Sequence, residues 1–482
     1  MATKKDLVEA YSFGRRRLVT AFVSGAPGGR EVEPSRPGRT IVGGLALAML
    51  LAAGAAIAGV LAPRTPDGWT TNGLIVSKET GQAYVILPGA DGSAPEPGEQ
   101  VELRPVINIT SATLILGADV EPMLISQDTI DDQRIGDDIG ILGAPASLPA
   151  PDRLVETGWT SCTGDDRGMR VRVAVDPDVR PAPDAAQVVE VDGSFYLIAS
   201  ERLGDDPAAA YALRLPGGDT VDNLLGALDL PARVFAPSVP RGWLDLFPFG
   251  AALDWESFGL GGVGERPDAW DAAGVPGRAR VGDVLRDADG DAVVLTEDGP
   301  ADLDPFALAV YANTRTPGRG TPRVLPVDRF PDLARTRLPG PDRRWPTAPV
   351  EETVTDPCAV LVAAGEGAAV VQLAQGPGTG FDARDVLPGH AEVGVDPGRG
   401  AYVLSASPEG ARDPQPVVID AKGRANPLDG DGTADLLGYA DFPAPVVPDT
   451  WVKLFGAGVP LSQNLALCPP APAGAQDGPS CA

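Results

Sequence analysis

One uncharged block near the amino terminus constrains this 482-residue chain more than any other feature. Residues 40–62 contain no charged side chain and are mostly Ala, Leu, Ile, Val and Gly. As a helix, the 22 residues from Ile41 to Ala62 would measure about 33 Å, enough for a hydrocarbon core of about 30 Å. The sequence therefore predicts a single transmembrane helix over residues 40–62.

Charge changes sign across this block. Residues 1–39 carry a net charge of +4, whereas residues 63–482 carry −31. Positive flanks stay in the cytoplasm, which predicts a cytosolic amino terminus and a large acidic part outside. A run of 22 uncharged residues exceeds what a buried helix of a soluble protein needs, which argues against that alternative. A cleaved signal peptide would have an unusually long positive region, and Pro63 would hinder cleavage. We therefore expect an uncleaved anchor in the cell (inner) membrane.

Residues 5–23 have the spacing of an amphipathic helix. Its apolar side chains recur near helical spacing, and Arg15, Arg16 and Arg17 form a polar cluster. One interpretation is a basic helix lying on anionic lipid. The other is a cytosolic docking helix for a partner, with Tyr11, Phe13 and the three arginines as contact residues. The two interpretations are compatible.

Composition excludes several classes of function. The net charge of −27 argues against a nucleic-acid binder, because phosphate binding needs a cationic surface. A single His and four Cys leave no material for a His/Cys zinc cluster. Gly and Pro together supply 109 residues, which predicts short elements joined by many turns.

The acidic part repeats itself. A glycine followed two residues later by an apolar or aromatic strand recurs at Gly81, Gly193, Gly290 and Gly367, with a looser copy at Gly400. A longer repeat aligns residues 224–231 with 436–443 at an offset of 212, and residues 240–253 with 448–461 at an offset of 208. The first copy thus has four extra residues in a loop. Internal repeats of this kind predict modules that bury one another's faces.

The four cysteines are Cys162, Cys358, Cys468 and Cys481. Outside the membrane thiols are oxidised, so we expect disulfides. Cys468 and Cys481 lie close together and suit a local pair. Four cysteines nevertheless allow three connectivities, and the sequence alone does not choose among them.

No catalytic constellation stands out. The chain has no P-loop and no Gly-x-Ser-x-Gly elbow. The Gly-x-Gly-x-x-Gly match at Gly259, Gly261 and Gly264 lacks a preceding strand and a following helix, so we expect a flexible loop. His390 follows Pro-Gly in a turn, where a surface position is more common than a catalytic base. We expect no cofactor and no metal.

Two further patterns have simple explanations. Asp287, Asp289 and Asp291 have calcium-loop spacing, but the position that requires Gly is Ala292, which favours turns between strands. The glycosylation sequon at Asn108 lies in an apolar, strand-like run, where packing or a turn is the expected role.

Taken in order, these segments resemble a known family. A basic helix and a membrane helix precede Tyr84-Val85, an Asn-Ile-Thr-Ser-Ala-Thr run at residues 108–113 and a Gly-Ile-Leu-Gly-Ala-Pro segment at 140–145. Trp-Thr-Ser-Cys follows at 159–162, and the chain closes with the Leu-Gly-Tyr and Trp-Val-Lys-Leu-Phe pattern within 436–455. The chain resembles EccB, the membrane-anchored subunit of actinobacterial type VII (ESX) secretion systems.

The resemblance implies an α+β fold with an elongated extracytoplasmic part. This part would hold a central domain and about four β-rich repeats in quasi-twofold arrangement, with a disulfide joining Cys162 to Cys358. It also implies EccC, EccD, EccE and mycosin protease-like subunits as partners, self-association, and a membrane location. The Cys468 and Cys481 tail is not part of the family pattern.

We divide the chain accordingly. Residues 1–39 are the cytosolic segment and 40–62 the membrane helix, and the remaining divisions are repeat 1 (63–125), central domain (126–185), repeat 2 (186–255), repeat 3 with central domain (256–365), repeat 4 (366–465) and tail (466–482). We expect a non-catalytic scaffold subunit that supports export of folded substrates. The alternatives are an ATP hydrolase, as some family members are labelled, and an envelope- or peptidoglycan-binding repeat protein.

Overall fold

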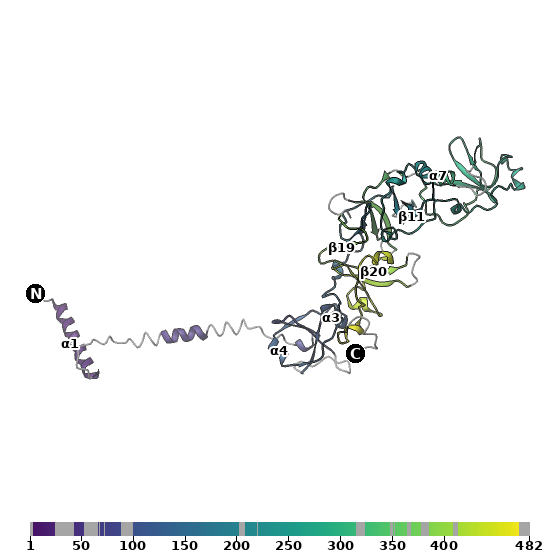
Figure 1. The fold of residues 1–482 in the computed structure, drawn as a ribbon. Helices are drawn as coiled ribbons and strands as arrows, with labels where there is room; N and C mark the ends of the chain where they lie inside the picture. The colour runs from purple at the N-terminus through teal and green to yellow at the C-terminus, as the bar shows by residue number, and fades with distance from the viewer. Residues whose placement is uncertain are drawn as a thin grey trace. The chain divides into compact units, whose positions relative to one another are not determined.

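The computed structural model describes residues 3–24, 43–52, 66, 68–71, 73–87, 100–201, 208–218, 220–314, 323–347, 350, 352–363, 368–376, 385–407 and 413–471 (Figure 1). The chain divides into two compact units, residues 1–66 and 67–482.

The first unit contains helix α1 (Lys4–Ser24), which coincides with the predicted amphipathic segment. Residues 43–52 are also helical. The rest of the predicted membrane span, residues 40–62, lies outside the described residues. Among the helices of the described part of the chain, none is both long and apolar enough to cross a bilayer.

The described residues of the second unit form a mixed α+β structure with five sheets. Four of these sheets share one connectivity. In each, three consecutive antiparallel strands are followed by a helix. The segment after this helix pairs in parallel with the first strand, and a later segment pairs in parallel with the third strand. In the second and third sheets some of these returns are single bridges, such as Ser238 beside Glu190 and Phe249 beside Ala212.

The first sheet has the strand order β4–β1–β2–β3–β5. Its elements are β1 (Leu74–Ser77), β2 (Ala83–Ile86), β3 (Glu102–Val106), α3 (Ile109–Leu116), β4 (Met123–Ile125), α4 (Gln127–Asp131) and β5 (Arg134–Ile135). The second sheet has the order β11–β10–β9–β16. Its elements are β9 (Ala185–Val191), β10 (Ser194–Ser200), β11 (Ala210–Arg214), α5 (Thr220–Ala227), α6 (Arg241–Leu244) and β16 (Glu352–Thr353).

The third sheet has the order β14–β13–β12–β15. Its elements are β12 (Val284–Arg286), β13 (Ala292–Thr296), β14 (Gly299–Leu303), α7 (Pro305–Asn313) and β15 (Val324–Pro326). The fourth sheet has the order β23–β20–β21–β22–β24. Its elements are β20 (Ala401–Ala406), β21 (Gln415–Ile419), β22 (Arg424–Pro427), α8 (Thr433–Leu436), β23 (Val446–Pro448), α9 (Asp449–Val452) and β24 (Gly456–Ala457), and α10 (Gln463–Ala466) follows.

The central sheet has the order β19–β7–β6–β17–β18–β8. Its strands are β6 (Trp159–Cys162), β7 (Met169–Val173), β8 (Arg180–Pro181), β17 (Pro357–Val362), β18 (Val370–Gln375) and β19 (Ala391–Val395). They come from two distant stretches of chain, and the second and third sheets lie between these stretches in sequence. Strands β18 and β19 fall within the range that the sequence assigned to repeat 4.

Tryptophans join the second and fourth sheets to the central sheet. Trp243 on α6 and Trp451 on α9 occupy the same position in the sequence repeat. Both are fully buried in one core with Trp159 of β6. The indole Nε1 of Trp243 donates a hydrogen bond of 2.8 Å to the carbonyl of Ser161. The aligned residues of the repeat thus serve the same packing purpose.

Helices join the sheets in two pairs. Helix α3 of the first sheet packs against α8 and α10, which accompany the fourth sheet. Tyr439 completes this junction by donating a hydrogen bond of 2.7 Å to the carbonyl of Pro149. Helix α5 of the second sheet packs against α7 of the third, and their apolar side chains share one core.

Two expectations from the sequence need correction. The run from residue 109 to 116 is helix α3, not a strand, because the Asn108 side chain caps it by accepting a hydrogen bond of 2.8 Å from the Ser111 amide. Such a cap outweighs the β preference of Ile and Thr. The glycine motif also divides: Gly81, Gly193 and Gly290 adopt positive φ in equivalent hairpins, whereas Gly400 precedes the first strand of its sheet. Gly367 lies outside the described residues.

Candidate functional site

The disulfide of the central sheet joins Cys162 on β6 to Cys358 on β17. The two residues face each other directly in the antiparallel register, and their Cα atoms are 4.0 Å apart. Both side chains are buried in a small apolar cluster with Val360 and Ala374. The pairing expected from the family resemblance is therefore present. It closes a loop of 196 residues that contains the second and third sheets.

The other cysteine pair is described only in part. Cys468 is disulfide-bonded. Its expected partner, Cys481, lies outside the described residues. The carbonyl of Cys468 accepts a hydrogen bond of 3.0 Å from the Gly140 amide, which ties the end of α10 to the first sheet.

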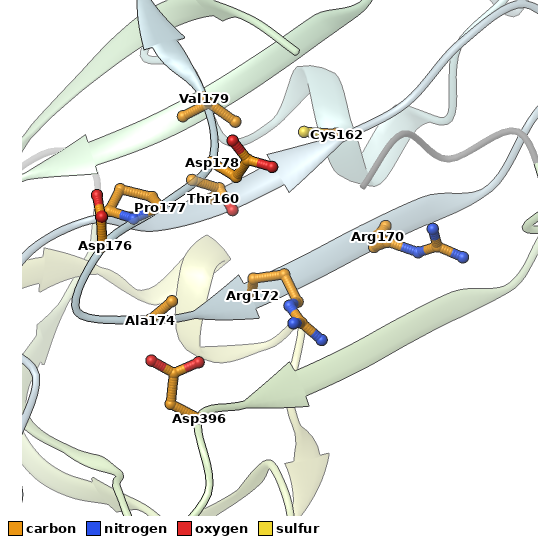
Figure 2. Close-up of a pocket in the computed structure, with 10 residues that line it drawn as sticks. All are labelled: Thr160, Cys162, Arg170, Arg172, Ala174, Asp176, Pro177, Asp178, Val179 and Asp396. Atoms are coloured by element: carbon orange, nitrogen blue, oxygen red, sulfur yellow. The ribbon is translucent and has the colours of Figure 1, made fainter. Parts of the chain in front are cut away.

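A small pocket lies beside the central disulfide (Figure 2). Arg170 and Arg172 of β7 line it, with Asp176, Asp178 and Asp396 around them. These five charged residues leave one net negative charge. The pocket's full lining is Thr160, Cys162, Arg170, Arg172, Ala174, Asp176, Pro177, Asp178, Val179 and Asp396.

The arginines of this pocket are held by β19. Arg170 forms an ion pair of 2.8 Å with Glu392, its register partner. Arg172 lies across Gly394, where a Cβ atom would come within 2.5 Å of its guanidinium. The lining contains no imidazole and no free thiol, its one hydroxyl is that of Thr160, and its three carboxylates lie among the guanidinium groups of two arginines. Its charged groups brace the outer face of the central sheet.

Helix α1 presents the second candidate surface. A stripe of mostly apolar residues runs along it at four-residue spacing and consists of Ala10, Tyr11, Gly14, Arg15, Leu18, Val19, Phe22 and Val23. Tyr11 and Phe22 expose 77% and 93% of their side chains. Of the predicted docking residues, the helix groups Tyr11 and Arg15 on this stripe, whereas Phe13, Arg16 and Arg17 lie off it. Ala10 and Gly14 were not singled out from the sequence, although their spacing places them there.

The remaining motifs are placed in turns and loops. The Asp287 carboxylate accepts hydrogen bonds from the backbone amides of Asp289 and Asp291, at 3.1 and 2.9 Å, which shapes the turn between β12 and β13. The ring Nδ1 of exposed His390 lies 3.1 Å from the carbonyl of Pro388. The turn interpretation of both motifs is thus confirmed.

The glycine-rich match at residues 259–264 is a loop between the second and third sheets. Gly259 ends a 3-10 turn with φ of 61°, and no α-helix follows Gly264 within the described residues 264–304. The carboxylate of Glu297 lies against Gly262, where a Cβ atom would come within 2.0 Å of it. An acidic side chain occupies the space that a phosphate would need. The loop is therefore built around this side chain and not as a dinucleotide site.

Two half-buried ionisable groups, Asp304 and Arg343, lie at the junction of α5 and α7. Asp304 caps α7 and accepts a hydrogen bond of 2.7 Å from the Ala307 amide, and burial raises the pKa of its carboxyl. Burial lowers the pKa of the Arg343 guanidinium, which stacks on Phe258 and Trp345 with centroid distances of 5.5 and 5.7 Å. Phe258 and Trp345 belong to the apolar core that the second and third sheets share.

Comparison with known proteins covers both units. A family profile described as "Type VII secretion system ESX-1, transport TM domain B" matches residues 1–470. A relative from Mycolicibacterium smegmatis named "ESX-1 secretion system ATPase EccB1" is 25% identical over 462 residues, covering 89% of this chain and 87% of the relative. One from Mycobacterium tuberculosis named "ESX-3 secretion system ATPase EccB3" is 26% identical over 495 residues, covering 90% and 84%.

Two solved structures share the fold. A chain of an intact ESX-5 inner membrane complex superposes with a TM-score of 0.56 at 21% identity, covering 97% of this chain and 95% of that one. A chain of an EccB3 dimer from the ESX-3 core complex gives the same TM-score and identity, covering 82% of this chain and all of that one.

Proposed function

Because this chain belongs to the EccB family of type VII secretion systems, we propose that it is a structural subunit of an ESX inner-membrane complex. The observation that carries the proposal is the extent of the family match, which runs from α1 through the fourth sheet. Relatives of similar length come from ESX-1 and ESX-3 systems, and the solved neighbours belong to ESX complexes.

The proposed topology follows from charge. A single helix over residues 40–62 crosses the membrane, with α1 in the cytosol and residues 67–482 outside. The sign change across the uncharged block supports this orientation.

The proposed architecture of the outer part is four repeats in quasi-twofold arrangement around the central sheet. The shared connectivity of four sheets supports it, as do the equivalent positions of Trp243 and Trp451 against Trp159. The pairing of α3 with α8 and of α5 with α7 supports the same arrangement.

The proposed role is a scaffold that supports export without catalysis. EccC, EccD, EccE and a mycosin-like protease would be its partners, and copies of the chain would also associate with one another. The stripe on α1 would contact cytosolic or membrane partners through Tyr11 and Arg15. Its exposed aromatic side chains support this, since unpartnered apolar stripes of this size mark interaction sites.

Co-purification tests the proposal. The full-length protein, extracted in a mild detergent, should bring the other subunits with it, as identified by mass spectrometry. A Tyr11→Ser/Phe22→Ser variant should lose cytosolic partners and keep those that bind outside; a Phe13→Ser variant is the control from off the stripe. If the wild-type protein is recovered alone, the scaffold proposal is wrong.

Nucleotide hydrolysis is the second candidate, because relatives are named ATPases. Nucleotide turnover by the purified chain, compared with that of an Arg170→Gln/Arg172→Gln variant in the pocket beside the central disulfide, separates the candidates. We expect no turnover in either. Turnover that persists through purification and falls in the variant would favour the hydrolase.

A further inference from the structure

Two large apolar side chains project from the second sheet's connection between α5 and α6. Val234 and Phe235 lie in a short 3-10 turn, η3 (Arg233–Phe235), and expose 79% and 75% of their side chains. Among the described residues of the second unit, these are the most exposed large hydrophobic side chains. Exposing such a pair to water gives no stability to the monomer.

The internal repeat shows that the fold does not need this turn. Pro231 and Pro240 align with Pro443 and Pro448 of the fourth sheet, and eight residues separate the first pair but only four the second. Both segments return to the sheet in the same way, with Ser238 beside β9 and β23 beside β20. The four extra residues of the sequence repeat therefore build the turn that carries Val234 and Phe235.

The turn is held in place from both ends. The Arg233 guanidinium pairs with the Asp222 carboxylate at 3.2 Å, and the Arg233 amide donates a hydrogen bond of 3.2 Å to the same group. On the far side, the Ser238 amide donates a hydrogen bond of 3.0 Å to the Asp165 carboxylate. An apolar pair fixed in this way loses little conformational freedom on binding.

The geometry points to a second copy of this chain as the occupant, with Val234 and Phe235 as the anchor of the contact. This inference rests on the self-association within the proposed function. The relative solved as a dimer supports a second copy. Charge supports it too: a chain with a net charge of −27 repels its copies, but charges of both signs surround the turn. In an isologous pair, the exposed Arg167 of one copy can face the exposed Asp166 of the other.

Two side chains are too small to form a stable interface alone. A standard interface covers about 800 Å² on each partner, and a few buried anchors carry most of the binding energy. Val234 and Phe235 are therefore the anchor of a larger contact. Because their side chains are free of the monomer core, replacing them leaves folding intact.

The test compares self-association of full-length variants in detergent. Val234→Ser/Phe235→Ser should raise the dissociation constant for self-association, measured by analytical ultracentrifugation, at least about tenfold. Leu124→Ser is the matched control, because Leu124 is 55% exposed on β4 of the first sheet, and it should leave the constant unchanged. Phe235→Cys should in addition give a disulfide-linked dimer under oxidising conditions, and Leu124→Cys should not.

Each other result contradicts the inference. An unchanged dissociation constant for the double variant, or a wild-type chain that remains monomeric, would show that the turn does not anchor a second copy. Loss of a different subunit, with self-association kept, would assign the turn to that subunit. Co-purification from the same preparations reports on the proposed function separately, since it requires only that the wild-type chain brings other subunits.

Discussion

Removing the central disulfide is the sharpest test of how the outer part is held together. The Cys162→Ala/Cys358→Ala variant deletes the link between β6 and β17 and retains small apolar side chains in the cluster. These strands also pair through backbone hydrogen bonds, so the sheet can still form. The covalent link mainly restricts the unfolded chain, because it closes a loop around the second and third sheets.

The size of the effect follows from the length of that loop. For 196 residues, the chain-entropy relation gives a stabilisation of about 5 kcal/mol. This is an upper figure, because the unfolded chain retains some compactness. We expect the double variant to lose about 3–5 kcal/mol of unfolding free energy.

Urea unfolding followed by tryptophan fluorescence measures this loss. Trp159 lies on β6, three residues before Cys162, and Trp243 and Trp451 share its core, so the signal reports on the central sheet. The control is Thr160→Ala/Val360→Ala, which removes the adjacent cross-strand pair and keeps the disulfide. Reductant should destabilise the wild type and this control, whereas the cysteine variant should respond far less.

A loss below about 1 kcal/mol in the cysteine variant would refute the reasoning. It would mean that the unfolded ensemble already holds the two strands together, so that the covalent link restricts nothing further. A variant that fails to secrete or fold would instead be compared with wild-type protein reduced after purification, where the same free-energy difference is expected.

Three further predictions concern the packing. Trp243→Phe should cost about 1 kcal/mol more unfolding free energy than Trp451→Phe, because only the first breaks a buried indole hydrogen bond; equal losses in urea unfolding would contradict this. Gly168→Ala should destabilise the folded chain by at least about 2 kcal/mol, since its Cβ would lie 2.2 Å from the His390 carbonyl. Gly226→Ala on α5 is the control, because its Cβ meets nothing within 4 Å, and it should stabilise the chain slightly. Similar melting temperatures for the two variants would contradict this reasoning. Burial raises the pKa of the Asp304 carboxyl, so the folded state loses stability as pH rises through that pKa. The unfolding free energy of Asp304→Asn, measured in urea, should therefore rise relative to that of the wild type between pH 4 and pH 7. A difference between the two proteins that stays constant with pH would show that burial of this carboxyl does not control the stability.

The family, the internal repeat and the amphipathic helix were accessible from sequence because each is a local pattern. The alignment of residues 240–253 with 448–461 marks side chains that meet the same surroundings twice. Helix α1 follows from the spacing of its apolar residues. The turn interpretations of Asp287 and His390 rest equally on neighbouring residues.

Other features depended on contacts between distant segments. The strand-like run after Asn108 became a helix because one side chain supplied a cap. The glycine motif did not distinguish a hairpin within a repeat from a turn elsewhere, since local backbone preferences are the same in both. Nor did the repeat alone indicate that its extra residues expose Val234 and Phe235.

Local preference and period thus identified the modules, because they depend on neighbours along the chain. The assembly depended on which buried surfaces fit together. Cys162 and Cys358 face each other because β6 and β17 pair across 196 residues. Trp243 and Trp451 meet Trp159 because the second and fourth sheets pack on one central sheet. Such pairings are set by the complementarity of whole surfaces, which no single segment of the sequence contains.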